Sequence, residues 1–300
     1  MKLQLNRRGF TLIELLVAMT ITMILVATLM YMTGISVDTY KKSREEVRAN
    51  RLAKEALETI AKDLEGLVAQ RDGNNFEWLY CANESNPEGP SKREITNASQ
   101  LIFFTAATDR YDGQIGQSGV DNGGDVSTVG YRLVYRDQIT NSTDGEYDVF
   151  ALYRNRVEPD ETFQDLLAEE DLEAAYTSSQ GSKELSSRSF LVENIYELTI
   201  TFLVEYSSTS GTTTTTTVER VTMGAGATPT ETFSLKGNGI ELTPANSNLT
   251  SGQLIGAEIS ITVLTDQGLE LAKRVSAYTQ ERLVREHGYH FTKSVILPRS

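Results

Sequence analysis

The 300-residue sequence predicts an α+β fold in which a long N-terminal helix packs on an antiparallel β-sheet head with insertions. Three observations lead to this prediction. Residues 10–37 form an apolar stretch, and residues 38 to about 71 continue with apolar positions at helical spacing. Most of the remaining chain consists of short runs rich in β-branched and aromatic residues, which favour strands. One long helix followed by strands is typical of the α+β class.

The apolar stretch is long enough to cross a membrane. The 23 residues from Leu15 to Val37 carry no formal charge, and as a helix they span about 34 Å, against a bilayer core of about 30 Å. Three basic residues precede the stretch: Lys2, Arg7 and Arg8. By the positive-inside rule, the first nine residues stay in the cytoplasm and the rest of the chain is exported.

Two ordinary kinds of segment fit this stretch less well. A secretory signal peptide has a shorter apolar core and then a small-residue cleavage site, whereas here the polar sequence TGISVDTYKK follows. A plain single-pass anchor accounts for the length but leaves Glu14 unexplained. A carboxylate within lipid costs about 2.5–3.5 kcal/mol and therefore calls for a partner.

An amphipathic second half of the helix is predicted from about residue 38 to Arg71, where the turn-forming sequence Asp72-Gly73-Asn74 follows. A helix from Phe10 to Arg71 would be about 93 Å long. Its second half is expected to pack on the sheet, and the irregular apolar spacing disfavours the alternative, a coiled coil. The apolar positions are Val37, Tyr40, Val47, Leu52, Leu57, Ile60, Leu64 and Leu67.

The remainder is predicted to form one head, because no Pro/Ser-rich linker divides it. Two further helices are predicted, one in the acidic segment 159–176 and one at residues 269–287. The threonine run 212–217 is predicted to be a loop in preference to an exposed edge strand, because of its low complexity. The predicted strands lie within residues 99–108, 128–137, 147–156, 190–208, 254–268 and 289–298.

Composition excludes several functions. The net charge of −13 disfavours nucleic acid as a partner, because phosphate binding needs clustered Lys and Arg. Cys81 is the only cysteine, so an intrachain disulfide and metal sites of the paired-cysteine type are excluded. The sequence contains no phosphate loop, nucleophile elbow or zinc motif, and we therefore expect neither an enzyme nor a resident cofactor.

Calcium is the one metal that the sequence leaves open. The glycine-rich stretch DRYDGQIGQSGVDNGGD offers carboxylate oxygens, which calcium prefers, but its spacing does not match the EF-hand loop, so a solvated loop is the favoured interpretation. The candidate ligands are Asp109, Asp112, Asp121 and Asp125. His287 and His290 lack an obvious third ligand and are expected to be surface or packing residues.

The segment RRGFTLIELLVAM resembles the cleavage and methylation motif of type IV prepilins and type II secretion pseudopilins: basic residues, Gly9, Phe10, a Thr-Leu pair, and Glu14 as the fifth residue after Gly9. The resemblance implies a pilin fold and a prepilin peptidase/methyltransferase that cuts after Gly9 and N-methylates Phe10. It also implies that Glu14 pairs with the new amino terminus of a neighbouring subunit as a filament assembles. Pairing with its own amino terminus is the alternative.

The chain is longer than typical major pilins, retains Glu14, has a charged second half of the helix and has a predicted C-terminal strand that ends near VILP; in these features it most resembles the J-type minor pseudopilins. It also resembles the Verru_Chthon cassette proteins with pseudopilin-type N-termini. The implied organisation is a leader at 1–9, a transmembrane half-helix at 10–37 and a periplasmic head at 38–300 that includes the second half of the helix. The implied partners are the peptidase, other pilin-type subunits and the inner membrane. A membrane-anchored or pilus-tip adhesion module with a pilin-type N-terminus is the alternative function.

Overall fold

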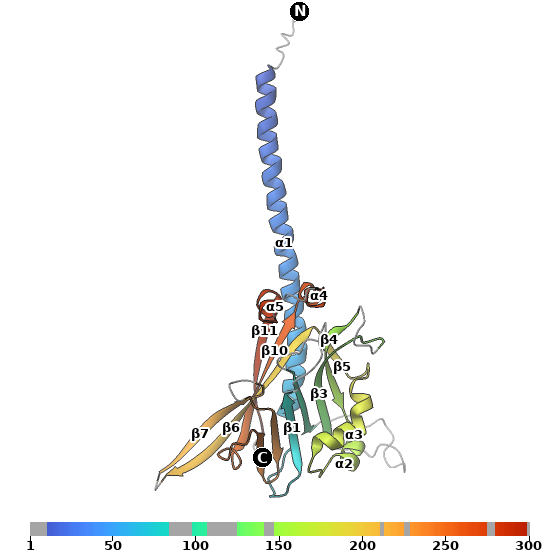
Figure 1. The fold of residues 1–300 in the computed structure, drawn as a ribbon, viewed down its shortest axis with the longest axis vertical. Coiled ribbons are helices and arrows are strands. Elements are labelled where there is room, and N and C mark those ends of the chain that lie inside the picture. Colours follow the sequence, from blue (N-terminus) through green and yellow to red (C-terminus); the bar gives the residue numbers. More distant parts are fainter. Residues whose placement is uncertain are drawn as a thin grey trace, which may run out of the picture. The chain divides into compact units, whose positions relative to one another are not determined.

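Figure 1 shows the computed structural model, which describes residues 11–83, 98–106, 125–140, 147–210, 213–224, 229–274 and 280–298. The contacts of the chain divide it into two compact units, residues 1–48 and residues 49–300. Residues 49–300 are the head. The long N-terminal helix and the antiparallel sheets confirm the predicted α+β class.

Helix α1 (Leu12–Glu65) ends six residues before Arg71, so the predicted end of the helix was wrong. Beyond the helix the chain lies against a strand, where the Val68 amide donates to the Phe104 carbonyl at 2.9 Å. Tertiary hydrogen bonds of this kind take over the backbone groups that a longer helix would have used. The Asp72-Gly73-Asn74 turn signal belongs to the loop before the first strand.

The head part of α1 presents small and branched apolar side chains to the core. Its buried apolar residues are Ala49, Leu52, Ala53, Ala56, Leu57, Ile60, Ala61 and Leu64. The four alanines make this face narrow, so that strands can approach the helix axis closely. The predicted stripe is confirmed from Leu52 to Leu67 but was wrong for Val37, Tyr40 and Val47, which are exposed.

A seven-stranded antiparallel sheet forms one part of the head, in the spatial order β5-β4-β3-β2-β1-β8-β9. The strands within 99–108, 128–137 and 147–156 are confirmed. Strands β1, β8 and β9 were not predicted, because β1 lacks clear alternation and the other two have only five residues each. The strands are β1 (Glu77–Asn83), β2 (Ser99–Thr105), β3 (Ser127–Arg136), β4 (Val149–Arg156), β5 (Phe190–Glu193), β8 (Thr232–Lys236) and β9 (Gly239–Thr243).

A second, four-stranded antiparallel sheet has the order β11-β10-β6-β7. Its strands are β6 (Ile195–Ser210), β7 (Thr213–Thr222), β10 (Gln253–Leu264) and β11 (Gly288–Ile296). The predicted strand at 190–208 is in fact two, because the chain changes sheets at Asn194. This residue has a φ of 64°, a left-handed conformation that asparagine tolerates better than most residues.

The threonine run was wrongly predicted to be a loop. The described residues from Thr213 to Thr217 belong to β7 and pair with Ser210 to Tyr206 of β6. Threonine is β-branched and favours strands, and this preference outweighs the low complexity of the run.

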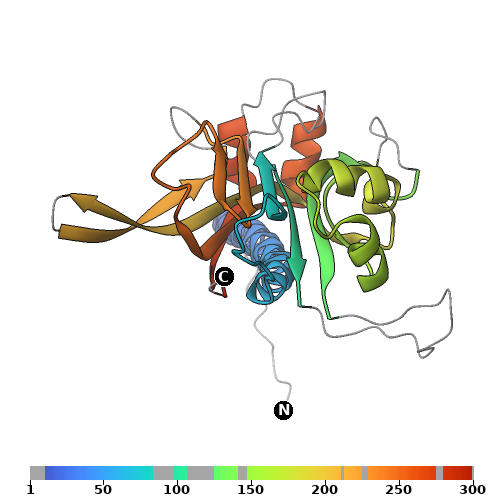
Figure 2. The same cartoon turned by 90° about the horizontal axis from the view of Figure 1, so that it is seen from below.

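Two hydrophobic cores lie on opposite faces of the seven-stranded sheet. Leu101 and Phe103 of β2 belong to the larger core, with the head part of α1 and the inner face of the four-stranded sheet. Their alternate neighbours Ile102 and Phe104 belong to the smaller core, as the two-residue period of a strand requires. The smaller core is closed by α2 (Pro159–Asp165) and α3 (Leu172–Glu184), which Figure 2 shows beside the green strands, on the side away from α1.

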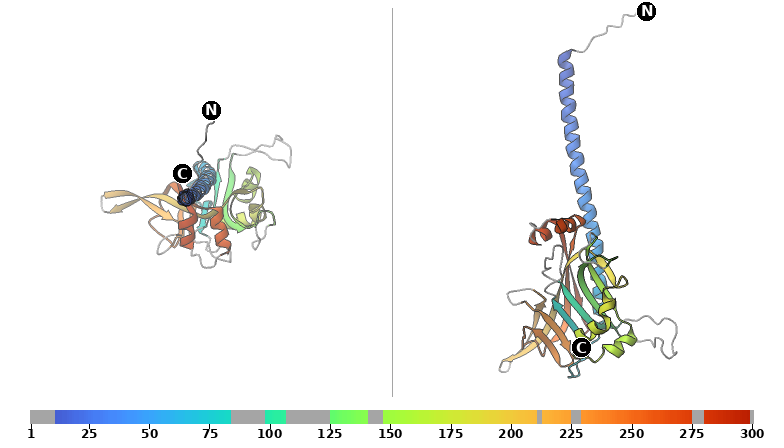
Figure 3. Two further views of the ribbon diagram at one scale, coloured as in Figure 1. Left: turned by 90° about the horizontal axis from the view of Figure 1, so that it is seen from above. Right: turned by 45° about the vertical axis from the view of Figure 1, so that its right-hand side comes forward.

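The short helices agree in part with the predictions. The single helix predicted at 159–176 is two helices, α2 and α3, and the pattern at 269–287 corresponds to α4 (Asp266–Arg274) and α5 (Gln280–His287). Figure 3 shows α4 and α5 at one end of the head, where β11 begins. Strand β11 finishes at the opposite end of the head.

Candidate functional site

The residues of the predicted cleavage site lie outside the described residues. These are Gly9 and Phe10, together with the leader charges Lys2, Arg7 and Arg8. The description begins at Thr11, one residue before α1 and three before Glu14. Their roles therefore stay predictions, whereas the surroundings of Glu14 can be described atom by atom.

Glu14 caps the start of α1 together with Thr11. The Thr11 backbone amide and its hydroxyl both donate to Oε2 of Glu14 at 2.9 Å, and the Glu14 amide donates back to Oγ1 of Thr11 at 3.4 Å. This reciprocal pattern is a capping box, which satisfies backbone donors that a helix start leaves unpaired. The Thr-x-x-Glu spacing of Thr11 and Glu14 is visible in the sequence and could have predicted this capping box.

Only one of the two carboxylate oxygens of Glu14 is used by the cap. Both Thr11 donors reach Oε2, and within the described part of the chain Oε1 accepts no hydrogen bond. The side chain is exposed on the helix surface. An ionised carboxylate can accept about four hydrogen bonds, so Glu14 can cap its own helix and still receive a cation from outside.

The apolar half of α1 satisfies its polar side chains internally. Each of the five Ser and Thr hydroxyls between Leu12 and Val37 donates to a carbonyl three or four residues earlier, at 2.8–3.1 Å: Thr20, Thr22, Thr28, Thr33 and Ser36. In lipid no water is present to satisfy such groups, so hydrogen bonds within the helix remove the cost of burying them.

The surroundings of this half-helix fit a single-pass membrane anchor. Among the residues that the structure describes, α1 is the one helix long and apolar enough to cross a bilayer, and its most apolar stretch is entirely unburied. Large apolar side chains from Leu12 to Val37 are exposed. Such a continuous apolar surface needs lipid or protein around it.

A second carboxylate of α1, Asp63, fastens the helix to the seven-stranded sheet. Arg154 of β4 donates from Nε to Oδ2 at 2.6 Å and from Nη2 to Oδ1 at 2.9 Å, and the Tyr131 hydroxyl of β3 donates to Oδ2. This is a bidentate ion pair, in which the planar guanidinium donates to both carboxylate oxygens. It joins the last turn of α1 to two strands.

The local environment shifts the pKa values of both partners of Asp63. Burial and then the negative charge of Asp63 raise the pKa of Tyr131 well above its ordinary value. Burial is the largest single influence on the pKa of Arg154 and lowers it, but the hydrogen bonds and electrostatic interactions with Asp63 and Tyr131 together outweigh burial and raise the pKa. Both side chains therefore keep their protons, and the network is a fixed structural contact instead of a proton-transfer site.

The calcium prediction remains untested. Asp109, Asp112 and Asp121 lie outside the described residues, and Asp125 is exposed in a bend before β3. Within the described residues, no group of three or more His, Cys, Asp or Glu side chains is placed to hold a metal ion. His290 is exposed, and its Nε2 lies 3.3 Å from the hydroxyl of Thr292.

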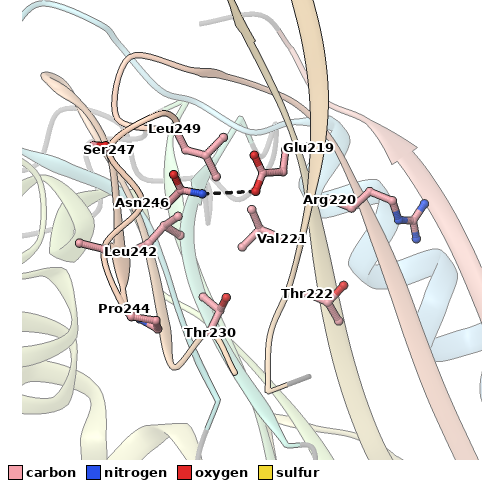
Figure 4. A pocket seen from close by; sticks show the side chains of 11 residues that line it. Glu219, Arg220, Val221, Thr222, Thr230, Leu242, Pro244, Asn246, Ser247 and Leu249 are labelled. Carbon is pink, nitrogen blue, oxygen red and sulfur yellow. Dashed lines mark hydrogen bonds between the residues drawn. The ribbon is translucent and has the colours of Figure 1, made fainter. Parts of the chain in front are cut away.

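A pocket of about 620 Å³ lies between β7 and the segment from Thr230 to Leu249 (Figure 4). Its one carboxylate, Glu219, accepts a hydrogen bond from the Asn246 amide at 3.3 Å. Arg220 points away from the pocket in Figure 4 and pairs with Glu258 of β10 instead. The lining also offers the hydroxyl groups of Thr222, Thr230 and Ser247, so the pocket can form hydrogen bonds with a small polar molecule.

Comparison with known proteins gives one match. Residues 4–30 match the family model described as "Prokaryotic N-terminal methylation motif". No curated protein and no solved structure matches the chain. The match confirms the prepilin-type motif and supports the type IV prepilin and pseudopilin family. It implies processing by a prepilin peptidase and assembly with pilin-type subunits; it covers the N-terminal segment alone and does not separate subtypes.

Proposed function

We propose that the chain is a minor pseudopilin-like structural subunit, most similar to the J type, that is cleaved after Gly9 and N-methylated on Phe10. It then assembles into, or primes, a type II secretion pseudopilus or a type IV pilus. Before assembly the apolar half of α1 lies in the inner membrane, with the head in the periplasm. The methylation motif at residues 4–30 is the observation that carries this proposal.

The free oxygen of Glu14 supports the assembly role. Cleavage after Gly9 would create an α-amino group on Phe10 that stays cationic after methylation. Because the capping box occupies only Oε2 of Glu14, the amino terminus of a neighbouring subunit can reach Oε1 without breaking the cap. Pairing of the two charges offsets the cost of a carboxylate in an apolar environment.

The net charge of the mature chain supports a low-copy subunit. Removal of the leader takes away three basic residues and leaves a net charge of −16. Like charge on neighbouring heads opposes a long homopolymer. A few copies, at a tip or at a point of initiation, avoid most of this repulsion.

The first test is the N-terminal sequence and intact mass of the full chain, made with and without a prepilin peptidase. We expect residues 1–9 to be lost and Phe10 to gain one methyl group only when the peptidase is present. An intact N-terminus in its presence would overturn the proposal and leave a membrane-anchored binding module.

The second test compares Glu14→Gln with Thr11→Val in cells that make the filament. Gln keeps an oxygen that can accept from Thr11 but removes the charge, so we expect incorporation into sheared filaments to fall at least about tenfold, as the loss of a few kcal/mol of intramembrane pairing implies. Thr11→Val weakens the cap and keeps the charge, so incorporation should stay within about twofold. Equal losses in both variants would contradict the pairing role.

A further inference from the structure

The β6–β7 hairpin extends beyond the sheet to which it belongs. β10 pairs with β6 only from Ile195 to Glu205, whereas β7 pairs with β6 as far as Ser210. Residues 206–210 of β6 and 213–217 of β7 therefore form a two-stranded ribbon, here called the distal ribbon. Figures 1 and 2 both show it reaching away from the rest of the head.

Tyr206, at the base of the distal ribbon, packs against the larger core, but the side chains described beyond it are exposed. Ser207, Ser208 and residues 214–217 are all exposed, and β7 is the last strand of its sheet. Among the described residues, no strand pairs with the outer edge of β7. Two-stranded ribbons are marginally stable alone in water, and a third strand would stabilise this one.

The ribbon lacks the devices that usually protect an edge strand. Natural edges carry Lys, Pro or inward-pointing charges that discourage pairing with another chain. Residues 206–218 contain no charged residue and no proline, although the whole chain has a net charge of −13. The nearest charges along the chain are Glu205 and Glu219.

We propose that the outer edge of β7, residues 213–217, pairs antiparallel with the same segment of a second copy of this chain. Pairing would join two four-stranded sheets into one continuous sheet about a two-fold axis. A two-fold contact requires a self-complementary surface, and with the axis at Thr215 the threonines 213–217 meet this requirement, because each then lies opposite a threonine of the other copy. Within the hairpin such pairs already form hydrogen bonds, as between Thr201 and Thr222 at 2.9 Å.

Charge favours a second copy at this edge more than elsewhere on the acidic chain. With the axis at Thr215, residue 219 of each copy lies opposite residue 211 of the other. The two Glu219 residues are then eight residues apart along the ladder, or about 27 Å. This separation is more than three times the Debye length of about 8 Å at physiological salt, so their repulsion is screened.

The test is cysteine cross-linking of the full chain in membranes, with the variants Thr214→Cys, Thr215→Cys and Thr216→Cys. Cys81 is fully buried and should contribute little background. We expect oxidation to give a disulfide-linked dimer of two copies at one or more of these positions. Pairing does not depend on cleavage after Gly9, so dimers should also form in cells without a prepilin peptidase.

Ser208→Cys on β6 is the matched control. In the proposed pair the two β6 strands are three strand spacings apart, or about 14 Å, too far for a disulfide. We expect at least about a tenfold difference in dimer yield between the best β7 position and this control. Adding Thr214→Lys and Thr216→Lys to the Thr215→Cys variant should abolish the dimer, because each lysine then faces a lysine across the ladder.

Three results would overturn the pairing. One is a dimer yield at all three β7 positions no higher than that of Ser208→Cys. Another is a cross-link to a different protein in place of a second copy, which would assign the edge to a strand of another subunit. The third is an undiminished dimer after the two lysine substitutions.

Discussion

The carboxylates of Glu14 and Asp63, in the two halves of α1, differ in how many of their oxygens accept hydrogen bonds from the chain itself. Glu14 lies exposed in the apolar half and uses one oxygen for its own helix cap. Asp63 lies near the end of the head half, and Arg154 and Tyr131 use both of its oxygens. The first carboxylate keeps an acceptor for another molecule, and the second is satisfied within its own chain.

This difference predicts that Glu14 matters for assembly and that Asp63, in the same helix, matters for stability of the head. A buried ion pair that loses one partner leaves an uncompensated charge, so substitution of Asp63 should affect folding of the head. A half-satisfied carboxylate on an exposed helix contributes little to the fold, so substitution of Glu14 should affect contacts between molecules. The following variants test this separation on the full chain in detergent.

Asp63→Asn should have the largest effect on stability. It removes the charge that balances Arg154, and loss of one partner of a buried pair costs about 3–5 kcal/mol. We expect the lower end, about 3 kcal/mol, because the Arg154 side chain is 26% exposed. Denaturation followed by the fluorescence of Trp78, the only tryptophan, measures the head alone.

Glu65→Gln is the control for Asp63→Asn, since it removes the same charge from an exposed position two residues later. Its effect should stay within about 0.5 kcal/mol. A loss in Asp63→Asn no greater than in this control would show that the Asp63 network does not hold the helix to the sheet.

Gly130→Ala should have an intermediate effect. A Cβ at Gly130 would lie 2.2 Å from the Tyr176 hydroxyl, which also accepts a hydrogen bond from Asn155. Either the tyrosine or β3 must move, and overpacking of this kind costs about 1–3 kcal/mol. The same denaturation experiment measures it, because Trp78 belongs to the same core as Tyr176.

Gly34→Ala, in the apolar half of α1, is the counterpart of Gly130→Ala. Apart from its chain neighbours and the surrounding backbone of the helix, no described atom lies within 4 Å of the added Cβ. The unfolding of the head should be unchanged, and any loss of filament incorporation would then report contact with another molecule. A large change in head stability would contradict the separation of the two halves.

Substitution of Glu77 should have the smallest effect on stability, and the size of this effect should depend on pH. Its carboxylate is buried and accepts from the Leu172 amide at the start of α3, at 2.7 Å. Burial, the largest cause, raises the pKa of Glu77 despite this hydrogen bond. A raised pKa in the folded state contributes stability that is complete below the unfolded-state pKa and is lost as the pH rises through the folded-state pKa.

Glu77→Gln removes this dependence while it keeps an acceptor for Leu172. The variant should therefore gain stability relative to the natural chain as the pH rises from about 4 to 7. Glu169→Gln, on the exposed loop beside it, removes the same charge and serves as the control. A stability difference that is constant with pH would contradict a raised pKa for Glu77.

Local patterns allowed much of the fold to be predicted. The apolar stretch, six strand-rich segments and the order of elements depend on periodicity, which can be read within a short window. The missed strands and the wrong prediction for residues 212–217 come from segments whose conformation is set by neighbouring strands. Likewise, α1 ends at Glu65 because β2 supplies a hydrogen-bond partner for Val68, which no local signal indicates.

The two carboxylate sites differ in the same respect. Glu14 could be singled out because the apolar residues around it are contiguous in the sequence, and its cap partner Thr11 is also local, three residues earlier. Asp63 could not, because Tyr131 and Arg154 lie 68 and 91 residues further along the chain. Contacts over such separations depend on sheet order, and the sequence alone left the order of the strands open.

Five hydroxyl groups of the apolar half-helix form hydrogen bonds to carbonyl groups of the same helix, so they need no partner from lipid, water or protein. Donor and acceptor are three or four residues apart, so none of these bonds has to be exchanged when the environment changes. The helix can leave a bilayer and enter a protein-lined fibre without solvating or desolvating any of these groups. The free-energy difference between the two locations then depends on apolar packing and on Glu14.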